Sequence, residues 1–165
     1  MQFVGPVLVT GGAGFIGSHI VDRLTDNMID VKAIDNLSTG KISNLSNSIG
    51  KRTFSFMKGD LCDIQEIRSS LKDINVVFHM AADPEVRTGF ENPRSSYNEN
   101  IRNTFYLLEE IRKSSVKKIV FASSSAVYGD ATIIPTPESY GPLLPISAYG
   151  ASKLACEAYL SSYCN

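Results

Sequence analysis

The sequence contains no tryptophan and only three cysteines among its 165 residues. These cysteines are Cys62, Cys156 and Cys164, and they form neither a Cys-x-x-Cys pair nor a cluster with histidine. Such a pattern indicates neither a disulfide framework nor a zinc site, because both depend on recurrent cysteine spacing. We therefore expect three free thiols and no metal.

Charge of one sign and long apolar runs are also scarce. The formal net charge is −1 and the basic residues are scattered, so the chain has no electrostatic footprint for nucleic acid or an anionic membrane. No apolar stretch is long enough to cross a bilayer, and the start of the sequence does not resemble a signal peptide. With 43% hydrophobic residues, we expect a single domain over residues 1–165, soluble and cytoplasmic.

A glycine-rich turn is the strongest local signal. The apolar run Val7–Val9 predicts a buried strand, and helical spacing then connects Ile16, Ile20, Val21 and Leu24. Between them lie Gly11, Gly14 and Gly17. Glycines there allow a tight turn and close approach of a ligand, and the N–H groups at the start of a helix suit a pyrophosphate. A turn that binds nothing is the alternative, whereas a P-loop is excluded because Ser18 follows where it needs lysine.

A second signal follows the next strand. Residues 31–34 read as a parallel strand, and Asp35 stands at its end. A carboxylate in this place accepts hydrogen bonds from the adenosine ribose and repels a 2′-phosphate, which favours NAD over NADP. An ordinary solvated turn residue is the alternative. The polar residues 37–44 predict a loop near the adenosine, whose end starts a short helix.

Further strands are expected at residues 54–59, 76–82 and 116–122, which makes five parallel strands in an α/β fold. Residues 83–97 and 130–147 read as loops because of their prolines and glycines. Helices are expected around residues 64–71, 98–113 and 147–160. The first is expected to carry Ile64, Ile67, Ser70 and Leu71 on one face, and the second is expected to be amphipathic, with Ile101, Phe105, Leu108 and Ile111 on its apolar face.

Several polar side chains near strand ends allow two interpretations. Asp60 either contacts the adenine amino group or caps the following helix. His79 is expected to form local hydrogen bonds at its strand end rather than to act as an acid or base. Asn100 either reaches the cofactor side of the sheet or is a helix cap or surface residue. The small side chains of Ala81 and Ala82 leave room for a cofactor at the strand end.

A tyrosine and a lysine at helical spacing suggest catalysis. Tyr149 and Lys153 are four residues apart and therefore share one helix face. A lysine ammonium stabilises a tyrosine phenolate, which makes the phenol a usable base. Ser124, which follows the fifth strand, is placed to hydrogen-bond the same substrate oxygen. The alternative is a pair on a solvated helix face.

Together, these motifs resemble the extended short-chain dehydrogenase/reductase family, and within it the nucleotide-sugar epimerases of the UDP-glucose 4-epimerase type, over essentially the whole chain. The resemblance implies a Rossmann-type doubly wound parallel sheet, NAD as cofactor, and epimerisation of a nucleotide sugar at its fourth carbon through a 4-keto intermediate. It implies Ser124, Tyr149 and Lys153 as catalytic residues. The implied cofactor-binding residues are Gly11, Gly14, Phe15, Ile16, Asp35, Asn36, Ser38, Thr39, Gly40, Asp60, Leu61, Met80, Ala81, Ala82, Asn100, Ala122, Tyr149 and Lys153.

Some positions depart from the family pattern. Asp83 stands where these epimerases often have glutamine, and Asn103 where glycine is usual. Ser125 and Ala126 occupy the places of the Asp-Glu pair of the related dehydratases, and without an acid/base pair we expect epimerisation or simple redox chemistry.

Length is the largest departure, because family members are roughly twice as long as this chain. We expect an incomplete Rossmann domain that is truncated after the catalytic helix and lacks the sugar-nucleotide domain. An NAD-binding module without turnover, or a related reductase or dehydratase, therefore stays open beside the epimerase. An exposed sheet edge at the fifth strand or at a neighbouring strand would favour a homo-oligomer or another association in which this edge is the contact.

Overall fold

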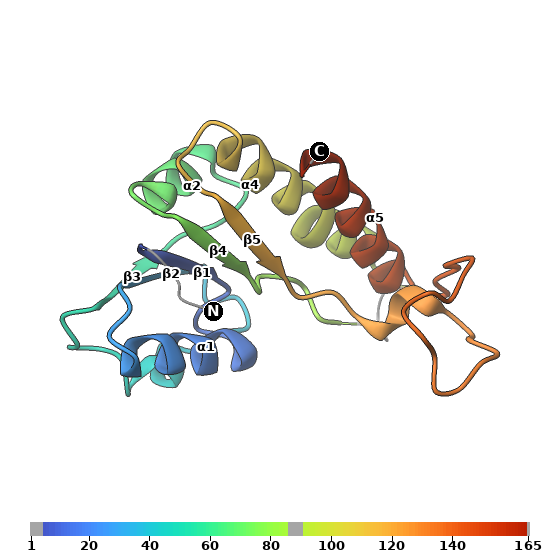
Figure 1. Ribbon diagram of the computed structural model, residues 1–165, viewed down its shortest axis with the longest axis horizontal. Helices are drawn as coiled ribbons and strands as arrows, with labels where there is room; N and C mark the ends of the chain where they lie inside the picture. The colour runs from blue at the N-terminus through green and yellow to red at the C-terminus, as the bar shows by residue number, and fades with distance from the viewer. Residues whose placement is uncertain (1–4, 86–90, 165) are drawn as a thin grey trace. The chain divides into compact units, whose positions relative to one another are not determined.

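The computed structural model describes residues 5–85 and 91–164 (Figure 1). The chain divides into two compact units, each described by itself below. The sheet unit comprises residues 1–81 and 109–122, and the helical unit comprises residues 82–108 and 123–165.

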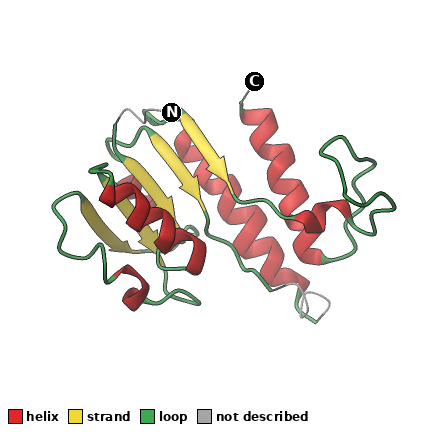
Figure 2. Ribbon diagram, turned by 60° about the horizontal axis from the view of Figure 1, so that its bottom comes forward, coloured by secondary structure: helices red, strands yellow, loops and turns green. Residues whose placement is uncertain are grey.

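The sheet unit contains five parallel strands (Figure 2). They are β1 (Val7–Thr10), β2 (Val31–Asp35), β3 (Phe54–Lys58), β4 (Val76–His79) and β5 (Lys118–Phe121). Their order is β3-β2-β1-β4-β5, so the direction of winding reverses between β1 and β4. All four side chains of β1 are buried, as expected for a central strand covered on both faces. The predicted Rossmann-type sheet is confirmed.

Helices cover this sheet on opposite faces. Helix α1 (Phe15–Asp26) lies on one face and α2 (Ile64–Leu71) on the other (Figure 1). The short 3₁₀ helix η1 (Ile42–Leu45) ends the polar loop, as expected. On α2 the buried side chains are Ile67, Ser70 and Leu71. Ile64, the first helical residue after the cap, is exposed.

The first helix of the helical unit begins at Pro93, five residues before the predicted start at residue 98. Helix α3 (Pro93–Ser95) and the π-helix η3 (Ser96–Arg102) precede α4 (Asn103–Ile111), whose residues 109–111 belong to the sheet unit. A proline is well tolerated as the first helical residue because that position needs no N–H donor. The loop predicted for residues 83–97 is therefore wrong over its last residues, and residues 86–90 lie outside the described part of the chain.

The π-helical segment also changes which helix face is buried. Its i→i+5 hydrogen bonds add a residue to the turn and so rotate the side chains that follow. Ile101 and Phe105 are only partly buried, whereas the fully buried residues are Ser96, Asn100, Asn103, Thr104, Leu107, Leu108 and Glu110. Leu108 of the predicted apolar face is buried, and the sequence prediction missed the burial of the polar residues Asn100, Asn103 and Thr104.

Two further elements complete the helical unit. The 3₁₀ helix η4 (Ser125–Tyr128) follows β5 in the chain, and α5 (Ala148–Tyr163) ends the described residues. Ser147 caps α5, since its Oγ accepts a hydrogen bond from Gly150 N at 3.0 Å. The predicted helix is confirmed and extends three residues further than expected, to Tyr163.

Neither a membrane span nor a metal-ligand set occurs among the described residues. None of their helices combines the length and the apolar character that crossing a bilayer requires. No three of their His, Cys, Asp or Glu side chains gather as a candidate metal site. Cys62 and Cys164 are exposed and Cys156 is buried, each as a free thiol.

Candidate functional site

The glycine turn after β1 leaves no room for side chains at three of its positions, Gly11, Gly12 and Gly17. Gly11 has a φ of +65°, and a Cβ on it would lie 2.7 Å from Ala81 N. A Cβ on Gly17 would lie 2.1 Å from the carbonyl oxygen of Gly11. Glycine is therefore required for β1, the turn and the first turn of α1 to approach one another this closely.

The N-terminus of α1 presents backbone donors. Its cap, Gly14, has extended backbone, no side chain caps it within the described chain, and its first turn carries no acidic residue. Phe15 and Ile16 are 79% and 59% exposed. The first N–H groups of a helix have no intrahelical acceptor, and the helix dipole is positive at this end. The turn thus fits an anionic group such as a pyrophosphate.

Asp35 lies beside this turn at the end of β2. Its Oδ2 accepts a hydrogen bond from Ala13 N at 3.0 Å, and its Oδ1 accepts one from Leu37 N at 2.8 Å. Each carboxylate oxygen has a further lone pair, so Asp35 can still accept a hydrogen bond from a ribose hydroxyl. The interpretation of Asp35 as a solvated turn residue is wrong, because the side chain is almost fully buried.

The loop after β2 is held against the glycine turn. Lys41 N and Asn44 Nδ2 both donate to the carbonyl oxygen of Ala13, at 3.0 and 2.8 Å. A Cβ on Gly40 would lie 2.9 Å from both Ala13 C and Asp35 Oδ1. Sequence reasoning missed Asn44, because an asparagine in a polar loop carries no local sign of so distant a partner.

Asp60 and its neighbours lie at the ends of β2 and β3. Its Oδ2 accepts a hydrogen bond from Asn36 Nδ2 at 2.9 Å, and its backbone N donates to Glu66 Oε2 at 2.6 Å. The cap of α2 is Asp63, whose carboxylate accepts two backbone N–H groups of the first turn. The interpretation of Asp60 as the cap is therefore wrong.

His79 is a buried structural residue. Its Nδ1 lies 2.7 Å from Thr10 Oγ1, and its ring is 5.6 Å from that of Phe121. Thr10 Oγ1 also accepts a hydrogen bond from Ala81 N at 3.2 Å. The predicted hydrogen bonding of His79 at its strand end is confirmed. Thr10 on β1 contacts both His79, the last residue of β4, and Ala81, which follows β4.

In the helical unit, α5 packs closely against η4. A Cβ on Gly150 would lie 2.5 Å from the carbonyl oxygen of Ala126, so only glycine permits this contact. Ser124 caps η4, because its Oγ accepts a hydrogen bond from Ala126 N at 3.2 Å. Ser123 Oγ donates to Glu157 Oε1 on α5. These contacts hold the serine segment against the helix that carries Tyr149 and Lys153.

Lys153 is buried beside Tyr149. The lysine is 3% exposed, and its Nζ lies 5.7 Å from the centre of the tyrosine ring. Burial lowers the pKa of Lys153, an effect that a nearby Cys156 thiolate would oppose. Burial in turn raises the pKa of Cys156, which favours the neutral thiol. The interpretation of the pair as lying on a solvated helix face is therefore wrong.

Asn100 is also buried in the helical unit. Its Oδ1 accepts a hydrogen bond from Asp83 N at 2.7 Å, and its Nδ2 donates to Ser152 Oγ at 2.8 Å and to the carbonyl oxygen of Asp83 at 3.2 Å. The interpretations of Asn100 as a helix cap or a surface residue are wrong. Sequence reasoning missed Ser152, although its position directly before Lys153 in the predicted catalytic segment could have identified it.

The predicted site residues divide between the two units. The catalytic candidates Ser124, Tyr149 and Lys153 lie in the helical unit with Ala82 and Asn100. The sheet unit contains Gly11, Gly14, Phe15, Ile16, Asp35, Asn36, Ser38, Thr39, Gly40, Asp60, Leu61, Met80, Ala81 and Ala122.

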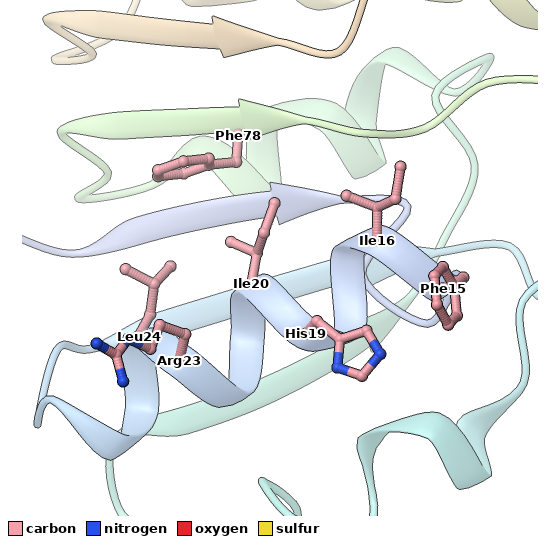
Figure 3. Close-up of a pocket in the computed structure, with 7 residues that line it drawn as sticks. All are labelled: Phe15, Ile16, His19, Ile20, Arg23, Leu24 and Phe78. Atoms are coloured by element: carbon pink, nitrogen blue, oxygen red, sulfur yellow. The ribbon is translucent and has the colours of Figure 1, made fainter.

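A hollow of about 530 Å³ in the sheet unit lies along α1 and is apolar (Figure 3). Ile16, Ile20 and Leu24 project from α1 toward the strands, and Phe78 projects from β4 toward the helix. His19 and Arg23 supply its polar atoms. Because its lining is apolar, the hollow does not resemble the predicted pyrophosphate site.

Comparisons with known proteins identify the family to which this sequence and fold belong. The family model described as "NAD dependent epimerase/dehydratase family" matches residues 7–165. UDP-glucose 4-epimerase of Mycolicibacterium smegmatis is 38% identical over 161 residues, which are 96% of this chain and 51% of that protein.

Two solved structures extend the comparison. UDP-N-acetylglucosamine 4-epimerase from Methanobrevibacter ruminantium, in complex with UDP-N-acetylmuramic acid, is 42% identical with a TM-score of 0.91, over 98% of this chain and 51% of its own. UDP-glucose 4-epimerase from Thermus thermophilus, in complex with NAD, is 39% identical with a TM-score of 0.86, over 96% and 50%. The chain spans about half the length of these relatives. A family match over nearly the whole chain, joined to these identities, establishes that the chain belongs to the NAD-dependent epimerase/dehydratase family.

Proposed function

We propose that this chain supplies the NAD-binding and catalytic residues of a nucleotide-sugar 4-epimerase of the UDP-glucose 4-epimerase type. The observation that carries the proposal is the buried Lys153 beside Tyr149, on a helix packed against the segment of Ser124. Family membership and the names of the relatives support the same reaction.

The residues of the sheet unit fit NAD. The turn at Gly11 and Gly14 and the exposed start of α1 would hold the pyrophosphate, because they offer backbone donors without an obstructing side chain. Asp35 would hold the adenosine ribose, and its negative charge disfavours the extra phosphate of NADP. Asp60 and Leu61 would lie near the adenine.

In the proposed mechanism, NAD held by the sheet unit would supply reversible hydride-transfer chemistry for the fourth carbon of the sugar. Tyr149 takes the proton of the 4-hydroxyl as the hydride leaves the fourth carbon, which gives a 4-keto sugar, and it returns a proton to the oxygen when the hydride comes back. Lys153 stabilises the phenolate form of Tyr149 by its positive charge. Ser124 Oγ accepts a backbone hydrogen bond, which leaves its own hydrogen available for the sugar oxygen.

Epimerisation is favoured over dehydration by the side chains after Ser124. Eliminating water needs an acid/base pair at the sugar. Ser125 and Ala126 begin η4 in these positions and provide no carboxylate. The absence of acidic side chains at these two positions supports an epimerase.

The proposal is tested with the protein as its gene encodes it, supplied with NAD. UDP-glucose and UDP-N-acetylglucosamine are offered separately, and the epimeric products are measured by chromatography. Tyr149→Phe is expected to lower kcat by at least about 100-fold, because proton transfer is lost. NAD affinity should stay within about twofold, since the backbone turn that binds the pyrophosphate is untouched.

Tyr159→Phe is the matched control, because it removes a phenol from the same helix and keeps the ring that contacts Phe105. It should leave kcat unchanged. NAD binding without any product from either sugar nucleotide would overturn the epimerase proposal and leave the binding module. An active Tyr149→Phe variant would instead show that the base is misassigned.

A further inference from the structure

A continuous run of hydrogen bonds crosses the helical unit and ends on Tyr149. Asp83 N donates to Asn100 Oδ1 at 2.7 Å, and Asn100 Nδ2 donates to Ser152 Oγ at 2.8 Å. Ser152 Oγ in turn donates to the carbonyl oxygen of Tyr149 at 2.7 Å. The run therefore joins the segment that follows β4 to the backbone of the catalytic helix.

The two middle side chains are shielded from water. Asn100 is 2% exposed and Ser152 is 1% exposed. A buried polar group that loses its partner cannot form a hydrogen bond with water instead. Loss of one hydrogen bond in the run therefore leaves a buried donor or acceptor unsatisfied. The run is therefore a buried connection rather than a set of surface contacts.

Ser162 provides an internal comparison on the same helix. Its Oγ donates to the carbonyl oxygen of Tyr159 at 2.8 Å, three residues back, as Ser152 does to Tyr149. Ser162 is exposed, whereas Ser152 also accepts a hydrogen bond from Asn100 in the buried interior. The local bond is thus ordinary for a helical serine, and the link to Asn100 is what distinguishes Ser152.

The partner of Ser152 lies in an unusual segment. Asn100 belongs to the π-helix η3, and such segments often occur at functional sites. The backbone carbonyl of Asn100 also accepts a weak hydrogen bond from Cys156 Sγ at 3.5 Å, one turn after Ser152. Ser152 and Cys156, which lie one turn apart on α5, therefore both form hydrogen bonds with Asn100 of η3.

From these contacts we propose that Ser152 is a positioning residue, which anchors the first turn of α5 to Asn100 and thereby fixes Tyr149 and Lys153 for proton transfer. The inference rests on the proposed function, because it assigns the proton transfer to Tyr149. Ser152 itself touches neither the sugar nor the cofactor in this role. It acts through the backbone to which Tyr149 and Lys153 are attached.

The test compares Ser152→Ala with Ser162→Ala in the protein as its gene encodes it. Ser152→Ala lowers kcat about tenfold, the effect of one buried hydrogen bond, while KM and NAD affinity change less than about twofold. Ser162→Ala loses the same kind of local bond and leaves kcat unchanged. Equal kcat values for Ser152→Ala and the wild type would overturn the proposal. So would a parallel change in kcat and KM together with a lower melting temperature, which indicates a merely structural role.

A second pair keeps the test decisive if Ser152→Ala does not fold. Ser152→Thr and Ser152→Val have the same shape and differ only by the hydroxyl. The proposal requires that the threonine variant has the higher kcat, by about tenfold. Equal kcat values for this pair would overturn it.

Hydrogen exchange separates this inference from the proposed function. Without the Ser152 hydroxyl, residues 96–102 lose an anchor, and their amides exchange faster in Ser152→Ala than in Ser162→Ala. This result requires no substrate. If the wild type epimerises neither sugar nucleotide, the proposed function fails, while faster exchange still supports the anchor. Unchanged exchange in residues 96–102 overturns the anchor whatever the activity.

Discussion

Asp60 and Asp63 have different partners although only three residues separate them. Asp63 accepts the backbone N–H groups of Gln65 and Glu66 at the start of α2, whereas Asp60 binds Asn36. Asp63→Ala is expected to lower the free energy of unfolding by about 1 kcal/mol, the usual cost of losing a helix cap. Urea unfolding measures this loss, and isothermal titration calorimetry should find NAD affinity unchanged.

Asp60→Ala is the matched comparison, and it should weaken NAD binding more than Asp63→Ala does. The reason is that Asp60 fixes Asn36 at the end of β2, next to Asp35. Equal NAD affinities for the two variants would contradict the assignment of Asp60 to the adenine end of the site.

The roles of single residues were predictable where the chemistry is local. The glycine turn and Asp35 could be inferred because a strand, a turn and a helix follow one another within 30 residues. The burial of Asn100 and Ser152 could not, since their hydrogen bond joins residues 52 positions apart. Their sequence neighbourhoods are compatible with a surface asparagine and an ordinary helical serine.

At the scale of the elements, a buried carboxylate ties α2 to the end of α4. Glu110 accepts hydrogen bonds from Arg68 Nε at 2.6 Å and Lys113 Nζ at 2.8 Å. The bond from Arg68, followed by that from Lys113, lowers the pKa of Glu110 to about 2. Because this pKa lies below that of an unfolded chain, Glu110 stabilises the fold above about pH 5, and this contribution is lost as the pH falls toward 2.

Glu110→Gln is therefore expected to lower the free energy of unfolding at pH 7, by about 1 kcal/mol or less because solvent reaches Arg68. The difference from the wild type should shrink as the pH is lowered from 5 to about 2. Denaturant unfolding at several pH values measures it. Glu109→Gln is the control, since Glu109 pairs with Arg112 in a more exposed position. A difference that is the same at pH 7 and pH 2.5 would contradict the assignment.

The elements themselves were largely predictable, because each strand is a short apolar run between turn residues. The helix from Pro93 to Ile111 was the exception. Its π-helical segment buries Ser96 and Asn100 instead of a purely apolar stripe. A period of 3.6 residues cannot identify that face, because the helix changes its own period within η3.

At the scale of the whole molecule, the sheet ends in two edge strands, β3 and β5. Among the described strands, β3 pairs only with β2 and β5 only with β4, so each has an edge that faces no other strand of this sheet. Such an edge is a template for pairing with another chain. Val120 on β5 is an exposed apolar residue of this strand.

We propose that the 165-residue chain associates through β5 in a concentration-dependent manner. Val120→Lys is expected to shift the association to about tenfold higher concentration, because charged side chains on an edge strand oppose pairing. Sedimentation velocity over a range of concentrations measures this shift. Ser55→Lys on β3 is the matched control, since it adds the same charge to an exposed position of the opposite edge strand. If both substitutions weaken association equally, a general effect of added charge explains the result. If Ser55→Lys alone weakens it, β3 is the associating edge and the assignment to β5 is wrong.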